Sequence, residues 1–199
     1  MGEPLIRSFD DFDQLLQRID TARNPYLFDT NLKYGLFLRH ILLKGTHDET
    51  LYVSVGEAEW VYGFLSRLLQ ETTSEDNKPK FSKLAILHLS KEAAERFEKE
   101  KRLSVNFYGR MNGNIEGLKK LSSVNKIKFC SILCEDIPNF HGYMFGNWVL
   151  KGEWKRDNSG TYGVRTSLEA FNRNKNEWDF ELFNKMFDRN KINWISNNA

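Results

Sequence analysis

Long apolar runs are absent from the sequence, and their absence excludes a membrane-spanning helix. The longest apolar stretches have about six residues, whereas a span needs about 18–20. The first residues, MGEPLIRSFDDFDQLL, are acidic and contain no apolar core of a secretory signal. They also lack the Ser or Thr of a myristoylation signal. We therefore expect a cytoplasmic protein without a membrane partner.

Cysteine and metal-ligand motifs are scarce as well. The two cysteines, Cys130 and Cys134, lie four residues apart and do not form a CxxC pair. The four histidines form no HxH, HExxH or HxxxH set; they are His40, His47, His88 and His141. The ligand count is too low for zinc, so we expect buried thiols, no metal and no cofactor. His88 lies within an apolar strand and is expected to be a hydrogen-bonded core residue.

Nucleotide and hydrolase signatures are missing too. The chain contains neither GxGxxG nor GxxxxGK[ST], and it has no GxSxG nucleophile elbow. The turn at 54–58 leads from a predicted strand into a helix, which is a place where backbone N–H groups can hold an anion. Glu57 puts a negative charge at that point. We interpret Glu57 as a helix-start residue stabilised by the helix dipole.

What is present suits one globular domain. The 199 residues are 40% hydrophobic, 14% aromatic and 28% charged, with a net charge of +2. This length fits a single domain with a substantial core. We divide it into an N-terminal helical segment (1–45), alternating strands and helices (50–134), and a hairpin with a final helix (138–190).

The middle segment alternates between two hydrophobic periods. Short apolar runs at 51–56, 84–89, 103–109 and 127–134 predict strands, and helical spacing predicts helices at 57–69, 91–101 (capped by Ser90) and about 115–121. Two more helices are predicted at 9–20 and 30–43. The alternation predicts an α/β fold with a mostly parallel central sheet and helices on both faces.

After Pro138 the sequence becomes rich in glycine and aromatic residues. The stretch 140–154 predicts a β-hairpin, with bulges at Gly142 and Gly146. A further strand is predicted from Tyr162, and a last helix at about 176–188. Exposed aromatics such as Trp154, lying beside basic residues, would suit stacking on bases or binding of a partner; those basic residues are Lys151, Lys155, Arg156 and Arg165.

Charge is distributed unevenly along the chain. Residues 1–77 carry a net charge of −6, residues 78–128 carry +8, and residues 129–199 balance. The basic surplus includes Lys126 and Lys128. Gathered on one side, these side chains would attract an anion such as nucleic acid; spread out, they are solvated surface.

The stretch from Ile127 to Phe187 resembles the C-terminal part of a phospholipase D-like domain. That family carries H-x-K-x4-D and, downstream, G-S-x-N. Here His141 matches the histidine, but Tyr143 stands at the lysine position and Trp148 at the aspartate position, and GSxN is not formed. The resemblance implies that His141 is the nucleophile on phosphorus. Without the lysine, it implies a degenerate domain that retains a binding role, in which Tyr143 and Arg165 contact the ligand.

Three functions follow from these observations. The leading expectation is an intracellular binding or regulatory module for nucleic acid or a protein, with no enzymatic activity. One alternative is an active phosphodiesterase or nuclease that uses His141 and completes its site by forming a homodimer. The other is a protein-interaction adaptor without a nucleic-acid role, which predicts a contiguous exposed apolar patch.

Overall fold

The computed structural model describes residues 9–21, 26–28, 31–44, 50–71, 78–138, 140–156 and 162–172, with Glu181, Asn184, Lys185 and Phe187. Most of the predicted helix at 176–188 lies outside these residues. The helices are α1 (Phe9–Thr21), α2 (Asn31–Lys44), α3 (Glu59–Glu71), α4 (Lys91–Lys99) and α5 (Phe107–Val124). The strands are β1 (Tyr26–Phe28), β2 (Thr50–Ser54), β3 (Lys83–Leu89), β4 (Lys128–Cys134), β5 (Phe140–Phe145), β6 (Trp148–Arg156) and β7 (Tyr162–Asn172).

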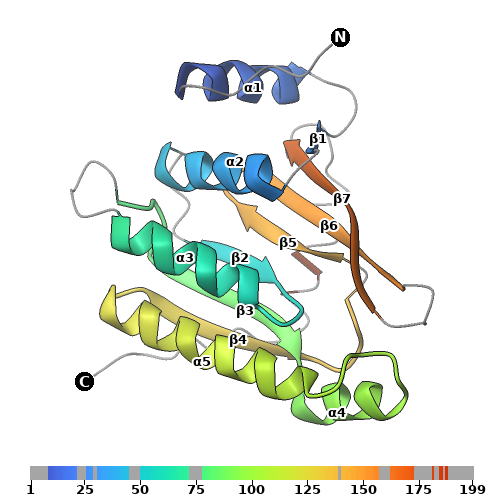
Figure 1. Cartoon of the computed structure of the whole chain (residues 1–199). Coiled ribbons are helices and arrows are strands. Elements are labelled where there is room, and N and C mark those ends of the chain that lie inside the picture. The colour runs from blue at the N-terminus through green and yellow to red at the C-terminus, as the bar shows by residue number, and fades with distance from the viewer. Residues whose placement is uncertain are drawn as a thin grey trace.

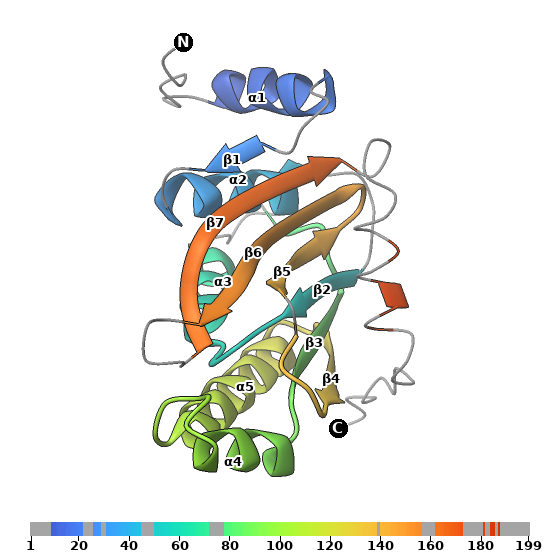
Figure 2. The same cartoon turned by 90° about the vertical axis from the view of Figure 1, so that its right-hand side faces the viewer.

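The described strands form a seven-stranded mixed sheet in the order β1-β7-β6-β5-β2-β3-β4 (Figure 2). The α/β class is confirmed, but the prediction of a mostly parallel sheet is wrong. Only β2, β3 and β4 run parallel, and every other neighbouring pair is antiparallel. The reason is that the C-terminal hairpin joins the same sheet by pairing β5 with β2, a tertiary choice that periodicity does not encode.

Helices α2, α3 and α5 cover one face of the sheet (Figure 1). The prediction of helices on both faces is therefore met only in part. Both crossovers, β2 to β3 and β3 to β4, step in the same direction along the sheet, so right-handed connections put their helices on the same side. On the opposite face the described cover is Phe187, which packs in one apolar cluster with Leu87 and Ile132.

The predicted strand at 103–109 is wrong, because this stretch leads into α5. Leu103, Phe107 and Met111 are all buried, and their spacing of four is helical rather than alternating. The Glu98 carboxylate accepts hydrogen bonds from the backbone N–H groups of Asn106 (3.0 Å) and Tyr108 (2.9 Å). These bonds satisfy donors that the first turn of a helix leaves unpaired. The expected short helix at 115–121 is thus the second half of an 18-residue helix.

The hairpin is confirmed, but its irregularities fall elsewhere. Register shifts lie between Gly152 and Trp154 and just after Lys155, whereas Gly142 sits in a regular ladder opposite Lys151. Gly146 has φ 56° in the two-residue turn that joins β5 to β6, a conformation that favours glycine. Gly142 allows close strand approach instead, since a Cβ there would lie 2.0 Å from the Leu150 carbonyl oxygen.

Candidate functional site

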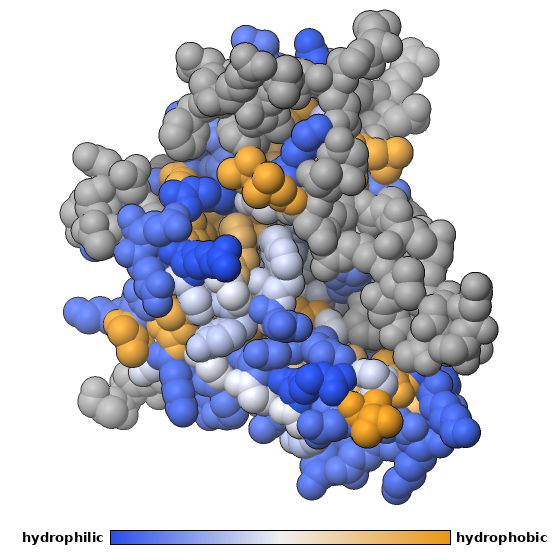
Figure 3. Space-filling view, viewed as in Figure 1, coloured by the Kyte–Doolittle hydropathy of each residue, from blue (hydrophilic) through white to orange (hydrophobic). Residues whose placement is uncertain are grey.

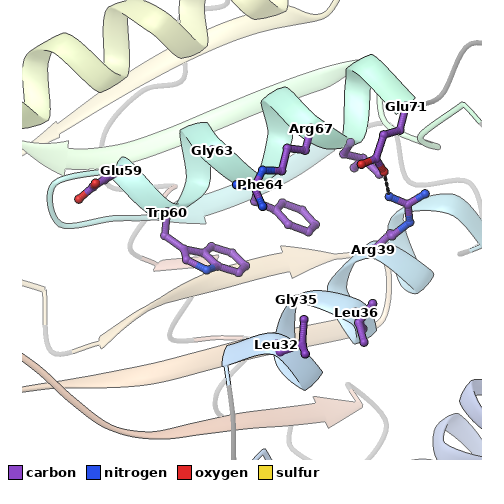
Figure 4. A pocket seen from close by; sticks show the side chains of 11 residues that line it. Leu32, Gly35, Leu36, Arg39, Glu59, Trp60, Gly63, Phe64, Arg67 and Glu71 are labelled. Carbon is purple, nitrogen blue, oxygen red and sulfur yellow. Dashed lines mark hydrogen bonds and ion pairs between the residues drawn. The ribbon is translucent and has the colours of Figure 1, made fainter. Parts of the chain in front are cut away.

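A groove of about 600 Å³ lies between α2 and α3, and we call it the α2–α3 groove. Apolar and pale surface lines this hollow, and hydrophilic surface borders it (Figure 3). Its walls come from two helices that cover the same face of the sheet (Figure 4). It is lined by Leu32, Gly35, Leu36, Arg39, Glu59, Trp60, Gly63, Phe64, Arg67, Leu68 and Glu71.

Two aromatic rings form the α3 wall of the groove. Trp60 and Phe64 stand one helical turn apart and stack with ring centroids 5.1 Å apart and planes 5° apart. The Trp60 ring also makes edge-type contacts with the buried rings of Tyr34 and Tyr143, at centroid distances of 5.9 and 5.8 Å. These contacts hold the aromatic wall in a fixed orientation, which lowers the conformational entropy lost when a ligand binds.

Two glycines keep the groove open. A Cβ at Gly35 on α2 would meet the Trp60 ring at 3.4 Å, and a Cβ at Gly63 on α3 would meet nothing within 4 Å. At these two positions the groove is therefore lined by helix backbone without a side chain, which leaves its volume open.

The rim combines exposed leucines with charges of both signs. Leu32 is 71% exposed and Leu36 is 37% exposed, so α2 presents apolar surface to water here. Arg39 and Glu71 form an ion pair that bridges the two helices at one end, and the Arg67 side chain lies beside Phe64, between that pair and Glu59 (Figure 4). Glu59 lies at the other end. The groove thus resembles a ligand site: a mostly apolar lining with a few charged groups.

This groove was not among the residues predicted from sequence. Its apolar residues follow helical spacing, and that pattern is the same for a buried core face and for a groove wall. Two features of the sequence were available as signals. The apolar face of α2 is wide and extends to Leu32, and each of the two helices contains a glycine. The adaptor alternative predicted an exposed apolar patch, and Leu32 and Leu36 supply apolar surface of that kind.

The structure places His141 and Tyr143 on the same face of β5. His141 is half-buried, and Tyr143 is only 3% exposed within the main core cluster. The Tyr143 ring lies 6.2 Å from the Tyr34 ring. At the position where the resemblance expects a phosphate-binding lysine, this chain therefore has a ring packed in the core.

The other predicted binding residues lie on two separate parts of the sheet. On β6 and β7, Trp154 is paired in register with Arg165, and Lys155 and Arg156 follow on β6. Only their backbone positions are described. Lys126 and Lys128 are exposed at the other edge of the sheet, at the start of β4.

Part of the basic surplus gathers at the beginnings of β3 and β4. Lys83 and Lys128 are neighbours across the parallel pair, and the Lys128 N–H donates to the Ser82 carbonyl (2.8 Å). We call the set Lys80, Lys83, Lys126 and Lys128 the basic edge. Lys80, Lys126 and Lys128 are exposed, and none of these three forms an ion pair with an acidic side chain in the described part of the chain. This edge lies apart from the positions of His141 and Trp154, so the predicted site residues do not form one cluster.

The turn after β2 is occupied by the protein's own charges. The Glu57 carboxylate accepts hydrogen bonds from Arg110 Nε (2.8 Å), Arg110 Nη2 (2.7 Å) and Ser104 Oγ (3.2 Å). The Arg110 hydrogen bonds hold the pKa of Glu57 below its usual range. Asn114 on α5 donates to the Glu57 carbonyl (2.8 Å). An arginine that would attract a phosphate here is already neutralised, which agrees with the missing nucleotide motifs.

The described residues also limit metal and membrane chemistry. Within them no three His, Cys, Asp or Glu side chains gather closely enough to hold a metal ion. Every helix in this part of the chain is too short or too polar to span a bilayer. The pKa of the Cys134 thiol rises to about 12, because of burial and the neighbouring carboxylates of Glu135 and Asp136.

Comparisons with known proteins do not assign the chain to a family. No family model and no curated protein matches the chain. Among solved structures the chain is similar to TrmBL2, an archaeal chromatin protein described as showing a novel mode of DNA binding. The TM-score is 0.42 at 10% identity, and the match covers 91% of this chain and 59% of that chain, so this chain spans about three fifths of its length. A likeness at that level establishes neither the fold family nor the function of this chain. The phospholipase D-like resemblance and the homodimer stay predictions.

Proposed function

We propose that this protein is a protein-binding module that holds an amphipathic helix of a partner protein in the α2–α3 groove. The observation that carries the proposal is the groove itself: exposed leucines on α2 face a fixed aromatic wall on α3, with open space at Gly63 between them. Apolar side chains left in water gain about 25 cal/mol for each Å² that a partner covers.

The dimensions suit a helix. From Glu59 to Glu71, α3 runs for about 18 Å at 1.5 Å per residue, which equals about three turns of a guest helix. A guest helix that lies in an apolar groove presents apolar residues at i, i+3, i+4 and i+7. A groove volume of about 600 Å³ holds several such side chains.

The charges on the rim specify the guest further. Arg67 is exposed and has no ion-pair partner in the described chain, so an acidic guest residue is favoured near it. Glu59 is exposed at one end of the groove and favours a basic guest residue. The Arg39–Glu71 pair is already satisfied and contributes less. We infer a guest with an apolar stripe, a basic residue at the Glu59 end and an acidic residue further along, where it meets Arg67.

The experiment uses a displayed library of helical peptides, because the partner is unidentified. Selection on the wild-type chain is followed by affinity measurement with three proteins: wild type, Gly63→Leu and Gly113→Leu. Both glycines are helical, exposed and have nothing within 4 Å of a built Cβ, but only Gly63 lines the groove. The leucine at 63 fills the space that the guest would occupy.

We expect selected peptides to carry the apolar stripe and to bind wild type and Gly113→Leu equally. Gly63→Leu is expected to weaken binding at least tenfold, which is about 1.4 kcal/mol. Charge reversal at Arg67 is expected to reverse the preference for an acidic guest residue. Peptides that bind all three proteins alike would refute the groove as the binding site.

The basic edge favours a second candidate function, binding of nucleic acid. Lys83 and Lys128 are adjacent across β3 and β4, and Lys80 and Lys126 lie within a few residues of them, so positive charge is concentrated at one edge. Lysine contacts with phosphates release counterions from the nucleic acid. The logarithm of the affinity therefore falls with the logarithm of the salt concentration, with a slope of about −0.9 for each phosphate contacted.

The test measures binding of a duplex DNA and a single-stranded RNA against salt concentration. Replacing Lys126 and Lys128 by Gln is expected to reduce the slope by about two. Replacing Lys99 and Lys101, which are exposed at the end of α4 and just after it, removes the same charge elsewhere and serves as control. Equal slopes for the two double variants would reject the basic edge as a nucleic-acid site.

A further inference from the structure

A serine in the middle of β4 and a histidine near the carboxyl end of β3 form a close pair outside the α2–α3 groove. His88 on β3 is 7% exposed, and its Nε2 lies 2.6 Å from Oγ of Ser131 on β4. Its other ring nitrogen, Nδ1, lies 2.9 Å from the Leu89 carbonyl oxygen. In the parallel register Ser131 is opposite Ile86 and His88 is opposite Leu133, so the two side chains are diagonal neighbours on one face.

The backbone carbonyl determines the tautomer of His88. A carbonyl oxygen only accepts hydrogen bonds, so Nδ1 must carry the proton and donate it to Leu89. Nε2 is then the unprotonated nitrogen, and it accepts from the Ser131 hydroxyl. This is the arrangement of a nucleophile, a general base and an orienting acceptor. Burial lowers the pKa of His88, so the imidazole is in the neutral form that a general base needs, while the same desolvation weakens it as a base.

The pair opens onto a cavity of about 260 Å³. Ser131 is exposed, while His88 is buried behind it. One wall comes from Lys91 and Glu92, the first two residues of α4, and the other from Tyr108, Asn112 and Lys119 of α5. Ser90 caps α4 by accepting from the Ala93 N–H, and the helix itself provides no acceptor for the N–H groups of Lys91 and Glu92. The side chains that line the cavity carry both signs of charge, since Glu92 and Glu116 accompany Lys91 and Lys119, and Lys119 Nζ lies 3.8 Å from Glu116 Oε2. Stabilisation of an oxygen that gains negative charge therefore falls to the N–H groups at the start of α4.

We propose that Ser131 and His88 are the nucleophile and general base of an esterase site for small carboxylic esters. Ser131 Oγ forms a bond to the ester carbonyl carbon while its proton moves to His88 Nε2, and the carbonyl electron pair moves onto oxygen. Collapse breaks the bond to the alcohol oxygen, which takes the proton from His88. Water then attacks the acyl-serine, with His88 again as base, releases the carboxylic acid and restores Ser131.

The size of the cavity limits the substrate class. A volume of about 260 Å³ accommodates an acetyl or propionyl ester but not a long acyl chain. A carbonyl in place of the usual carboxylate gives His88 orientation without a negative charge, so the imidazolium is stabilised less than in a full triad. We therefore expect slow turnover, with a clear dependence on both residues.

The first experiment uses a fluorophosphonate probe and p-nitrophenyl acetate on the full chain. We expect the probe to label Ser131, as located by mass spectrometry, and Ser131→Ala to lower ester hydrolysis at least a hundredfold. Ser123→Ala removes an exposed serine of α5 outside the cavity and is expected to change nothing. Labelling at other residues only, or hydrolysis that survives in Ser131→Ala, would overturn the proposal.

A second variant keeps the proposal testable even if the folded chain turns over no available ester. In Ser131→Cys the thiol is expected to react with iodoacetamide at pH 7 at least ten times faster than an unactivated thiol, because His88 takes its proton. Adding His88→Gln is expected to remove that increase, with circular dichroism confirming that both variants are folded. An ordinary alkylation rate in Ser131→Cys would show that the hydrogen bond is only structural.

Discussion

Two single variants, Gly142→Ala and Gly113→Ala, each add one methyl group to the chain. We expect them to change the free energy of unfolding in opposite directions. At Gly142 a Cβ would lie 2.0 Å from the Leu150 carbonyl oxygen and 2.8 Å from the Lys151 Cα. Both are backbone atoms of β6, which cannot move without disturbing the ladder between β5 and β6.

The magnitudes follow from these distances. Overpacking against a rigid neighbour costs 1–3 kcal/mol, and an overlap of more than 1 Å with backbone belongs at the upper end, so we expect Gly142→Ala to lose about 3 kcal/mol. At Gly113 on α5 a Cβ meets nothing within 4 Å, and alanine stabilises a helix interior by about 0.5–1 kcal/mol.

The assay is urea unfolding followed by circular dichroism, with thermal melting as a second measure. For a chain of this size 1 kcal/mol corresponds to about 2–4 °C. We expect Gly142→Ala to melt about 6–12 °C below wild type and Gly113→Ala to melt 1–4 °C above it. A Gly142→Ala variant within about 0.5 kcal/mol of wild type would refute the close approach of β5 and β6.

Three further predictions concern charge and protonation. Burial lowers the pKa of His88 and of His40, so the unfolded chain binds protons that the folded chain does not. The free energy of unfolding should therefore fall as the pH drops below about 6.5, by at most about 1.4 kcal/mol per pH unit for each histidine, and a flat profile from pH 7 to 5 would contradict this. Burial and nearby carboxylates raise the pKa of Cys134 to about 12. Iodoacetamide at pH 8 should therefore modify this thiol at least a hundredfold more slowly in the folded chain than in urea. Equal rates would be inconsistent with its burial. A double-mutant cycle with Glu57→Gln and Arg110→Ala should give a coupling of about 0.5–1 kcal/mol, since the pair is bidentate but partly exposed, and zero coupling would show that it does not hold the turn.

Periodicity located nearly all of the described elements, and it failed where tertiary contacts decided the outcome. The runs that became β2, β3 and β4 were predicted as parallel strands, and the structure confirms them. The stretch 103–109 was assigned as a strand because it is short and apolar. Its burial at Leu103, Phe107 and Met111 depends on the cover that α5 makes over the sheet, and local spacing did not separate the two readings.

The functional features could be predicted even less. Ser131 and His88 are 43 residues apart in the chain, and only the register of β3 against β4 brings their side chains within hydrogen-bonding distance. Trp60 and Leu32 both follow helical spacing, so the residue pattern within each helix does not show that a groove remains between the two helices.

The chain's own patterns therefore determined the α/β class, the helices and strands other than β1 and the start of α5, and the hairpin, because these depend on the spacing of apolar residues along a few turns or strands. The three-dimensional fold alone decided that β5 pairs antiparallel with β2, that the described crossover helices share one face, and that a groove and a Ser–His pair form. Those outcomes depend on how distant surfaces fit together, and side-chain spacing along the chain carries no information about that fit.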